Sequence, residues 1–272
     1  MIPAPFEYAR AGSVEEAISL LGSDPDAKIL AGGHSLLPAM RLRVARPSML
    51  VDIGRIAELS YVREDGDRLA IGALARHHDV ANAEVLQQLC PIVAHAAGQI
   101  GDPQVRHMGT IGGSVAHGDP AGDLPAVLLA LDAEFVAHGP NGTRAVAATH
   151  FFTSLFETAL APDEVLTEIR IPKANAGWSF MKFQRRAQDW AVVGVSAVRA
   201  NGGVHVGLTN MGLTPLRAAG VEEAVGGGAD PASAAARADE GTAPPDDAFG
   251  SAEYRRQLVK VLVRRALEEA LV

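Results

Sequence analysis

Two glycine-rich segments carry residue types that can hold a phosphorylated ligand. The first segment is AGGHSLLPAM at 31–40, and the second is GTIGGSVAHGDPAGDLP at 109–125. Glycine permits positive φ and lets a ligand approach bare backbone amides, and successive amides that point the same way form an anion-binding nest. Ser35 and Ser114 can donate hydroxyl protons to phosphate oxygens, and Asp123 can accept from a ribose hydroxyl. Paired glycines also occur in ordinary tight turns, but two such segments in one chain favour a nucleotide site.

Neither segment has the spacing of the common nucleotide motifs. Gly33 is followed by His34 and Ser35 rather than by Lys and a hydroxyl residue, which excludes a triphosphate-binding loop. Both segments also lack the spaced three-glycine fingerprint of a Rossmann domain. We therefore expect a nucleotide site of a different fold.

The residues on both sides of the first glycine segment are expected to form strands and helices. Lys28–Ala31 is a short apolar run that leads into it, and Met49–Ile53 is a second buried-strand candidate. Ser13–Glu16 has the form of a capping box, which predicts a helix that ends at Gly22.

The elements between residues 56 and 174 alternate between strand and helix signals. Asp65-Gly66 and Asn141-Gly142 are two-residue hairpin signals, and 85–100 carries apolar residues at helical spacing. Glu164–Ile171 alternates polar with apolar residues before Pro172, which predicts a half-exposed strand.

The last hundred residues read as a separate sheet with helices. Strand candidates at 179–183, 191–200 and 204–209 form an antiparallel meander, with a turn at 201–203. The Gly-, Ala- and Pro-rich stretch 225–250 suits a surface segment with at most one short helix. A final amphipathic helix is expected to present Tyr254, Leu258, Val261, Leu262 and Ala266 on one face.

The composition excludes several function classes. Hydrophobic residues form 48% and charged residues 21% of the 272 residues, as in ordinary soluble globular proteins. Asp and Glu number 32 against 24 Lys and Arg, and the net charge of -8 would repel a phosphate backbone, so no nucleic-acid partner is expected. No apolar run approaches the length of a bilayer span and the N-terminus lacks a signal-peptide pattern, so neither a membrane span nor export is expected.

The cysteine count limits the cofactors that this chain can hold. Cys90 is the only cysteine, whereas zinc-ribbon and iron–sulfur sites need several thiolates. A disulfide framework is excluded as well, and a cytoplasmic location is favoured.

The glycine motifs resemble those of a known family. Ala31–Ser35 and Thr110–Ser114, with Asp119-Pro120 and Asp123–Pro125 downstream, are similar to the FAD-binding medium subunit of the molybdenum hydroxylases. That family includes carbon monoxide dehydrogenase and bacterial xanthine, quinoline and nicotine dehydrogenases. The resemblance spans nearly the whole chain and continues through Leu37-Pro38, Val51–Gly54, Glu164–Leu166, Phe180–Lys182, Arg185-Arg186 and Asp189–Ala191. One departure is Arg106-His107-Met108 before Gly109, where many relatives have Asn-Arg.

The resemblance implies an α+β protein with two domains. Residues 1–174 would form an FAD-binding domain of the vanillyl-alcohol oxidase type, in two α/β subdomains of about 1–55 and 56–174, with FAD extended between them. Residues 175–272 would form the C-terminal flavoprotein domain of the carbon monoxide dehydrogenase type, in which a three-stranded antiparallel sheet packs with helices.

The resemblance also implies the cofactor-binding residues. Lys28, Ile29, Leu30, Ala31, Gly32, Gly33, His34, Ser35 and Leu36 would run along the pyrophosphate and flavin; Thr110, Gly113, Ser114, Asp119 and Asp123 would bind the diphosphate, ribose and adenosine side; Ile100, Gly101, Leu166 and Lys182 would lie near the rings; and Trp190 would approach the isoalloxazine. No catalytic residue and no metal ligand are assigned, because outer electron transfer requires no protein acid or base.

The activity implied is that of an FAD-carrying electron-transfer subunit. Substrate would be oxidised at a molybdopterin cofactor on a large partner subunit, and electrons would cross two [2Fe-2S] clusters on a small partner subunit to reach FAD and then an external acceptor. The complex would be a dimer of heterotrimers in the cytoplasm. The lone Cys90 agrees, because this chain must obtain its iron–sulfur relay from elsewhere.

Two alternatives stay open at the level of sequence. The first is a stand-alone flavin oxidase of the vanillyl-alcohol type, which predicts a covalent flavin or a substrate cavity over the ring. The second is a non-catalytic nucleotide-binding or assembly protein that has lost FAD, which predicts a protein that stays colourless when FAD is added.

Other polar residues have simpler structural explanations. His77-His78-Asp79 is better explained as a helix start with a capping role than as a metal site, because adjacent helical residues point to different faces. His34 and His117 are either proton relays or sources of loop-ordering hydrogen bonds. Cys90 reads as a small buried hydrophobe. Arg185-Arg186 is either a solvated pair or a contact with a partner subunit.

Overall fold

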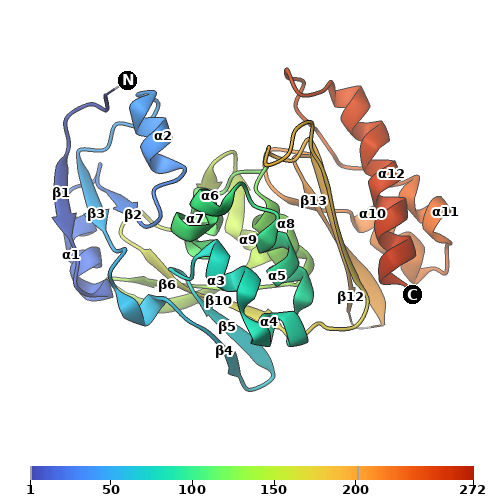
Figure 1. Cartoon of the computed structure of the whole chain (residues 1–272), viewed down its shortest axis with the longest axis horizontal. Coiled ribbons are helices and arrows are strands. Elements are labelled where there is room, and N and C mark those ends of the chain that lie inside the picture. Colours follow the sequence, from blue (N-terminus) through green and yellow to red (C-terminus); the bar gives the residue numbers. More distant parts are fainter. Residues whose placement is uncertain (1, 201) are drawn as a thin grey trace.

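The N-terminal lobe is a small parallel sheet with helices. The computed structural model describes residues 2–200 and 202–272, and in Figure 1 this lobe is the blue part on the left. Strands β1 (Glu7–Arg10), β2 (Lys28–Leu30) and β3 (Met49–Asp52) pair in parallel in the order β1-β3-β2, with helices α1 (Val14–Ser23) and α2 (Leu36–Arg41) between them. Val14, Ala17 and Leu21 of α1 are buried, so its apolar stripe faces the sheet.

The predicted capping box is present in a modified form. Ser13 Oγ accepts from Glu16 N at 3.2 Å, but the Glu16 carboxylate accepts from Gly12 N at 2.7 Å rather than from the cap residue. The prediction that Gly22 ends the helix was wrong, since α1 continues to Ser23.

The middle lobe is built on an antiparallel sheet. Its strands are β4 (Val62–Asp65), β5 (Arg68–Gly72), β6 (Glu134–Gly139), β7 (Gly142–Ala147) and β10 (Val165–Pro172), in the order β4-β5-β10-β6-β7. The helices are α3 (His77–Asn82), α4 (Glu84–Leu89), α5 (Pro91–Gly98), α6 (Pro103–Met108), α7 (Ile111–His117), α8 (Asp123–Ala130) and α9 (Ala148–Phe151), with η1 (Ala57–Leu59), β8 (Phe152–Ser154) and β9 (Glu157–Thr158) as short connecting elements. The helical spacing predicted over 85–100 is confirmed by α4 and α5.

Three details of this sheet differ from the sequence prediction. Strand β10 is mostly buried rather than half-exposed, because it pairs with β5 on one side and β6 on the other. Both predicted hairpins form, but each loop lies one residue from the predicted position. Asp65 belongs to β4 and pairs with Arg68, so the first loop is 66–67. Gly142 belongs to β7 and pairs with Gly139, so the second loop is 140–141.

The C-terminal lobe is a sheet covered on its outer side by helices, drawn in orange and red in Figure 1. Among the described residues, β11 (Trp178–Phe183), β12 (Val193–Ala200), β13 (Gly203–Thr209) and β14 (Leu216–Arg217) pair in sequence order, followed by α10 (Ala219–Gly226), α11 (Pro231–Ala235) and α12 (Ala252–Ala270). The prediction of three strands was wrong, because Leu216 and Arg217 add a short fourth strand against β13. Asn201, in the predicted turn, lies outside the described residues.

The buried face of α12 also differs from the prediction. Tyr254 and Val261 are exposed, whereas Val259 and Val263 are fully buried. Arg255, which was not among the residues expected on this face, is buried, and its guanidinium donates to Asp247 Oδ1 at 2.7 Å. The single short helix predicted within 225–250 is confirmed by α11.

Helix α8 joins the middle lobe to the C-terminal lobe. All its residues are buried, and it packs against β12 and β13. Gly207 of β13 is required here, since a Cβ at that position would lie 2.1 Å from the Ala126 carbonyl oxygen. Cys90 is buried in the core of the middle lobe, as predicted, and burial raises the pKa of its thiol to about 12.

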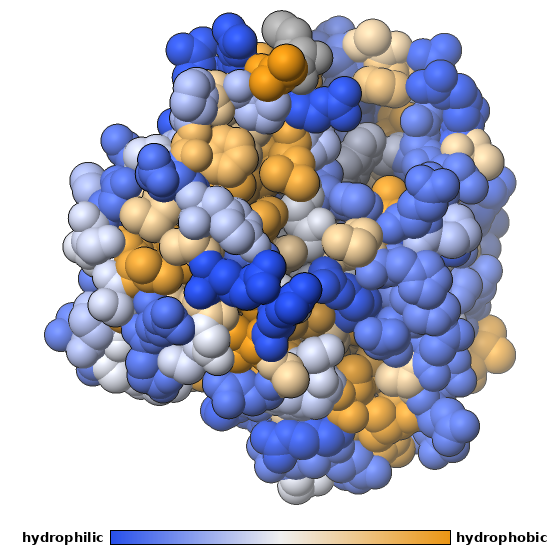
Figure 2. Space-filling model, turned by 60° about the vertical axis from the view of Figure 1, so that its left-hand side comes forward, coloured by the Kyte–Doolittle hydropathy of each residue, from blue (hydrophilic) through white to orange (hydrophobic). Residues whose placement is uncertain are grey.

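Part of the surface of the N-terminal lobe is apolar. On the face in Figure 2, which brings this lobe forward, apolar side chains come to the surface along the middle. Leu42 and Val44, just after α2, are 64% and 82% exposed. Within the described residues, no helix has the length and apolar character needed to cross a membrane.

Candidate functional site

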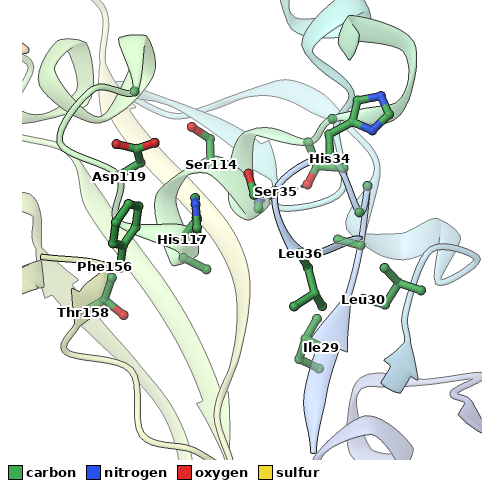
Figure 3. A pocket seen from close by; sticks show the side chains of 18 of the residues that line it. Ile29, Leu30, His34, Ser35, Leu36, Ser114, His117, Asp119, Phe156 and Thr158 are labelled. Atoms are coloured by element: carbon green, nitrogen blue, oxygen red, sulfur yellow. Dashed lines mark hydrogen bonds between the residues drawn. The ribbon is translucent and has the colours of Figure 1, made fainter. Parts of the chain in front are cut away.

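A cavity of about 700 Å³ lies where the N-terminal and middle lobes meet. Its volume is in the range of small-molecule and cofactor sites. Figure 3 shows Ile29, Leu30 and Leu36 on one side, and His117 and Asp119 on the other. Both glycine-rich segments therefore border one space.

Most of the predicted site residues meet in this cavity. Its lining includes Lys28, Ile29, Leu30, Ala31, Gly32, Gly33, His34, Ser35, Leu36, Ile100, Gly101, Thr110, Gly113, Ser114, Asp119, Asp123, Lys182 and Trp190. Leu166 lies instead in the core of the middle lobe, 6% exposed, on the doubly paired strand β10.

The first glycine segment connects β2 to α2. Gly33 has a φ of 75°, the left-handed region that favours glycine. Gly32 is required for another reason, because a Cβ there would lie 2.2 Å from the Met108 carbonyl oxygen and 2.9 Å from Gly109 Cα. Ser35 stands at the N-cap position of α2 without a capping hydrogen bond from its side chain, among the residues described. Gly32 thus lets the two glycine segments touch backbone to backbone.

The second glycine segment seats α7 on the middle lobe. Thr110 is buried, and its Oγ1 accepts from Gly113 N at 3.0 Å, which caps the helix. A Cβ on Gly112 would lie 2.5 Å from the Ala73 carbonyl oxygen. The sequence pattern suggested that these glycines let a ligand approach the backbone. Gly112 shows that they also let α7 pack closely against the chain at Ala73.

A buried ion pair stands in the cavity wall. Lys182 Nζ on β11 donates to Asp123 Oδ2 on α8 at 2.7 Å, with side-chain exposures of 4% and 6%. Burial raises the pKa of Asp123 to about 6, against the lowering effect of Lys182. Asp123 Oδ1 is also buried and has no hydrogen-bond partner among the described residues.

The neighbouring acidic and imidazole groups are also perturbed by burial. Burial raises the pKa of Asp119, whose Oδ1 accepts from Ala121 N at 2.8 Å. Burial lowers the pKa of His117, whose ring centroid lies 5.0 Å from that of Phe156. The nearby carboxylate of Asp119 opposes this lowering.

Two more histidines, His34 and His77, line the cavity. His34 Nε2 lies 3.3 Å from the Gln104 carbonyl oxygen, which fits a loop-ordering role. His77 begins α3 as predicted, but it makes no capping bond from its side chain, because Arg76 occupies the N-cap. Burial lowers the pKa of His77 to about 4, so it is neutral at physiological pH. No cluster of metal-ligating side chains occurs in the described part of the chain.

Sequence reasoning missed a third wall of the cavity. Two residues labelled in Figure 3 line it: Phe156 from the turn between β8 and β9, and Thr158 from β9 itself. Gly118, with a φ of 65°, packs against Thr158. The aromatic residue type at Phe156, which is 51% exposed in the structure, was the signal that the sequence offered. Thr158 carried none.

The loop between β11 and β12 borders the cavity from the C-terminal lobe. Gln188, Asp189 and Trp190 line it, and Trp190 is 61% exposed. Arg186 Nε donates to Asp189 Oδ2 at 3.0 Å, and Arg185 donates to the Ala248 carbonyl oxygen at 2.8 Å. Both arginines thus have partners within the chain.

Comparison with known families defines the class of this protein. Residues 4–174 match the FAD binding domain in molybdopterin dehydrogenase, and residues 178–270 match the CO dehydrogenase flavoprotein C-terminal domain. The chain belongs to this family of FAD-binding oxidoreductase subunits, and the resemblance inferred from the glycine motifs is confirmed.

Individual relatives match along almost the whole chain. The carbon monoxide dehydrogenase medium chain of Hydrogenophaga pseudoflava is 43% identical over 288 residues, covering 99% of this chain and 98% of that protein. The 6-hydroxypseudooxynicotine dehydrogenase complex subunit alpha of Paenarthrobacter nicotinovorans is 38% identical over 289 residues, covering 100% and 96%. A chain in the structure of the Hydrogenophaga pseudoflava carbon monoxide dehydrogenase that lacks the Mo-pyranopterin moiety superimposes with a TM-score of 0.95, at 44% identity, covering 100% and 99%.

The residues present fit the FAD that the family binds. Asp123 Oδ1, buried and without a partner among the residues described, can accept a ligand hydroxyl, and Ser35 and Ser114 can donate to phosphate oxygens. A buried carboxylate oxygen without a partner is costly in the free protein, and a ligand that donates to it would remove that cost. The cavity therefore has polar groups suited to a dinucleotide.

Proposed function

We propose that this chain is the FAD-carrying electron-transfer subunit of a multi-subunit molybdenum hydroxylase. The cavity carries this proposal, because both glycine-rich segments border it together with Asp123, whose buried Oδ1 has no partner among the described residues. When bound, FAD supplies the ability to accept electrons from one donor and release them to another acceptor. The protein's part is to bind, orient and electrostatically tune this cofactor.

We assign the cavity walls to the parts of FAD by family resemblance and by chemistry. Residues 28–36 would follow the pyrophosphate and flavin, and Thr110, Gly113, Ser114 and Asp119 would hold the diphosphate side. Asp123 would accept from a ribose hydroxyl. Ile100, Gly101 and Lys182 would lie near the rings, with Trp190 toward the isoalloxazine. No residue is assigned as an acid, a base or a metal ligand.

The fold proposal follows the same resemblance. Residues 1–174 would be an FAD-binding domain of the vanillyl-alcohol oxidase type with subdomains of about 1–55 and 56–174, and 175–272 the C-terminal flavoprotein domain. One apolar cluster lies wholly within 175–272, and another lies mainly in the N-terminal lobe with Leu59, Leu74 and Val165 of the middle lobe packed against it, which supports this division.

The proposed partners are a large molybdopterin-binding subunit and a small subunit with two [2Fe-2S] clusters. They would assemble with this chain as a dimer of heterotrimers in the cytoplasm, and electrons would pass from the clusters through FAD to an external acceptor. The single cysteine supports this arrangement, because Cys90 is buried and one thiol cannot hold a cluster. The exposed Leu42 and Val44 offer apolar surface for a partner.

Expression of the chain alone tests the proposal. We expect a protein that is yellow or becomes yellow with added FAD, that contains no stoichiometric iron or molybdenum, and that hydroxylates no substrate by itself. A protein that stays colourless with added FAD, or one with stoichiometric iron and a cluster-type spectrum, would contradict the proposal. Flavin that remains with acid-precipitated protein would favour the stand-alone oxidase instead.

A further inference from the structure

One cation of the C-terminal lobe bonds to two separate parts of the cavity wall. Lys182 Nζ lies 2.7 Å from Asp123 Oδ2 and donates to the Gln99 carbonyl oxygen at 3.1 Å. Gln99 directly precedes Ile100 and Gly101, which line the cavity. The ammonium group therefore links β11 to the end of α5 and to the start of α8.

The two carboxylate oxygens of Asp123 have different surroundings. Oδ2 is held by Lys182, whereas Oδ1 is buried without a partner among the described residues. Asp123 also lines the cavity, so the second oxygen remains for a ligand. A carboxylate accepts a stronger hydrogen bond when ionised than when protonated, because the bond is then charge-assisted.

Within the described part of the chain, Lys182 supplies the favourable charge close to Asp123. Burial and the neighbouring Asp119 raise the pKa of Asp123, and Lys182 is the group that lowers it. Removal of the ammonium group would therefore leave the carboxyl group protonated over a wider pH range.

We propose that Lys182 is a positioning residue that keeps Asp123 ionised, so that the C-terminal lobe sets the pH dependence of cofactor binding. This inference rests on the proposed function, in which FAD fills the cavity. Lys182 acts through the Asp123 carboxylate in this role. The C-terminal lobe thus contributes the Lys182 ammonium group to a site whose two glycine motifs lie in the N-terminal and middle lobes.

Other titratable groups lie on the elements around Asp123. His117 is the last residue of α7, and Asp119 follows that helix. His95 lies on α5, and His205 lies on β13. His205 Nδ1 is 3.1 Å from the Ala130 carbonyl oxygen, at the opposite end of α8. His117 is thus the group most easily mistaken for Asp123 in a titration near neutral pH.

The test is a titration of the full-length apoprotein with FAD between pH 5 and 8.5, followed by flavin fluorescence. In the wild type, the Kd for FAD should be constant above pH 6 and should rise below it by up to about tenfold per pH unit. Lys182→Met should move the onset of this rise upward by at least about one pH unit, with a Kd at pH 7 at least about twofold higher. Lys182→Arg should keep the wild-type onset.

Two further variants keep the test decisive if Lys182→Met fails to fold. Asp123→Asn should remove the acid-side rise in Kd, and His117→Asn, the matched control, should retain it. The inference is overturned if Asp123→Asn keeps the wild-type pH profile, or if folded Lys182→Met raises Kd by the same factor at every pH. A wild-type protein that binds no FAD at any pH would instead overturn the proposed function. Circular dichroism of each variant reports whether it folds.

Discussion

Two ion pairs join the C-terminal lobe to the first residue of α8 and to a residue just after its end, and they differ in exposure. At the cavity end, Lys182 and Asp123 are 4% and 6% exposed at 2.7 Å. At the other end, Arg217 and Asp132 are 18% and 50% exposed at 2.6 Å. The same type of contact thus occurs once inside the protein and once at its surface.

This difference determines what each pair can do. Water screens the Arg217–Asp132 pair, and Arg217 also pairs with Glu222 at 2.6 Å, so loss of Asp132 leaves the guanidinium a partner. Asp123 is only 6% exposed, and among the described residues Lys182 is the cation that lowers its pKa. The surface pair therefore adds a small increment of stability, whereas the buried pair controls the charge of a group in the cavity.

The largest effect is expected when the buried pair is broken. Lys182→Ala should lower the free energy of unfolding of the apoprotein by about 3 kcal/mol at pH 7.5, because it strands a buried carboxylate. The loss should shrink at pH 5, since a protonated Asp123 needs no cation. Denaturant titration at both pH values measures the effect, and an equal loss at the two would contradict it.

A second effect concerns the pH dependence of stability. Because the pKa of Asp123 is raised from 3.8 to about 6 in the folded state, the folded protein binds more protons than the unfolded chain between these values. Asp123 should therefore reduce stability as pH rises from about 4 to 6, by up to about 3 kcal/mol. The difference in unfolding free energy between wild type and Asp123→Asn, measured across this range, isolates this contribution, and a constant difference would argue against it.

Loss of the carboxylate should also weaken cofactor binding. Asp123→Ala removes one charge-assisted hydrogen bond of roughly 1.5 to 3 kcal/mol, so the Kd for FAD should rise on the order of tenfold to a hundredfold at pH 7.5. Flavin titration measures the change. An unchanged Kd would mean that Asp123 serves the wall of the cavity and not the ligand.

The smallest effect on stability is expected when the exposed Arg217–Asp132 pair is broken. Asp132→Asn should change the free energy of unfolding by less than about 1 kcal/mol and leave the Kd for FAD unchanged. Denaturant and flavin titrations of this variant provide the baseline for Lys182→Ala. A loss as large as that of Lys182→Ala would remove the distinction between the two ends.

The sequence predicted the local features of the site better than its tertiary features. Thr110 and Gly113 could be identified because the cap of α7 is encoded within a few residues. Leu166 was expected near the rings, whereas the pairing of β10 with two neighbours, which the sequence pattern does not show, places its side chain in the core. The close contact of Gly32 with Met108 also depends on two segments distant in sequence.

The C-terminal lobe shows the same limit. The face of α12 was wrong because a buried arginine, Arg255, breaks the rule that charged residues face water. The pairing of Lys182 with Asp123 could not be predicted, since fifty-nine positions separate the partners and no motif relates them. Polar contacts between lobes therefore require the structure.

Hydrogen exchange with and without FAD tests most directly whether the cofactor lies between the two glycine-rich segments. If it does, FAD should slow amide exchange in both 31–40 and 109–125, with little change in α12 on the outer side of the C-terminal lobe. FAD binding that leaves either glycine-rich segment unprotected would contradict it.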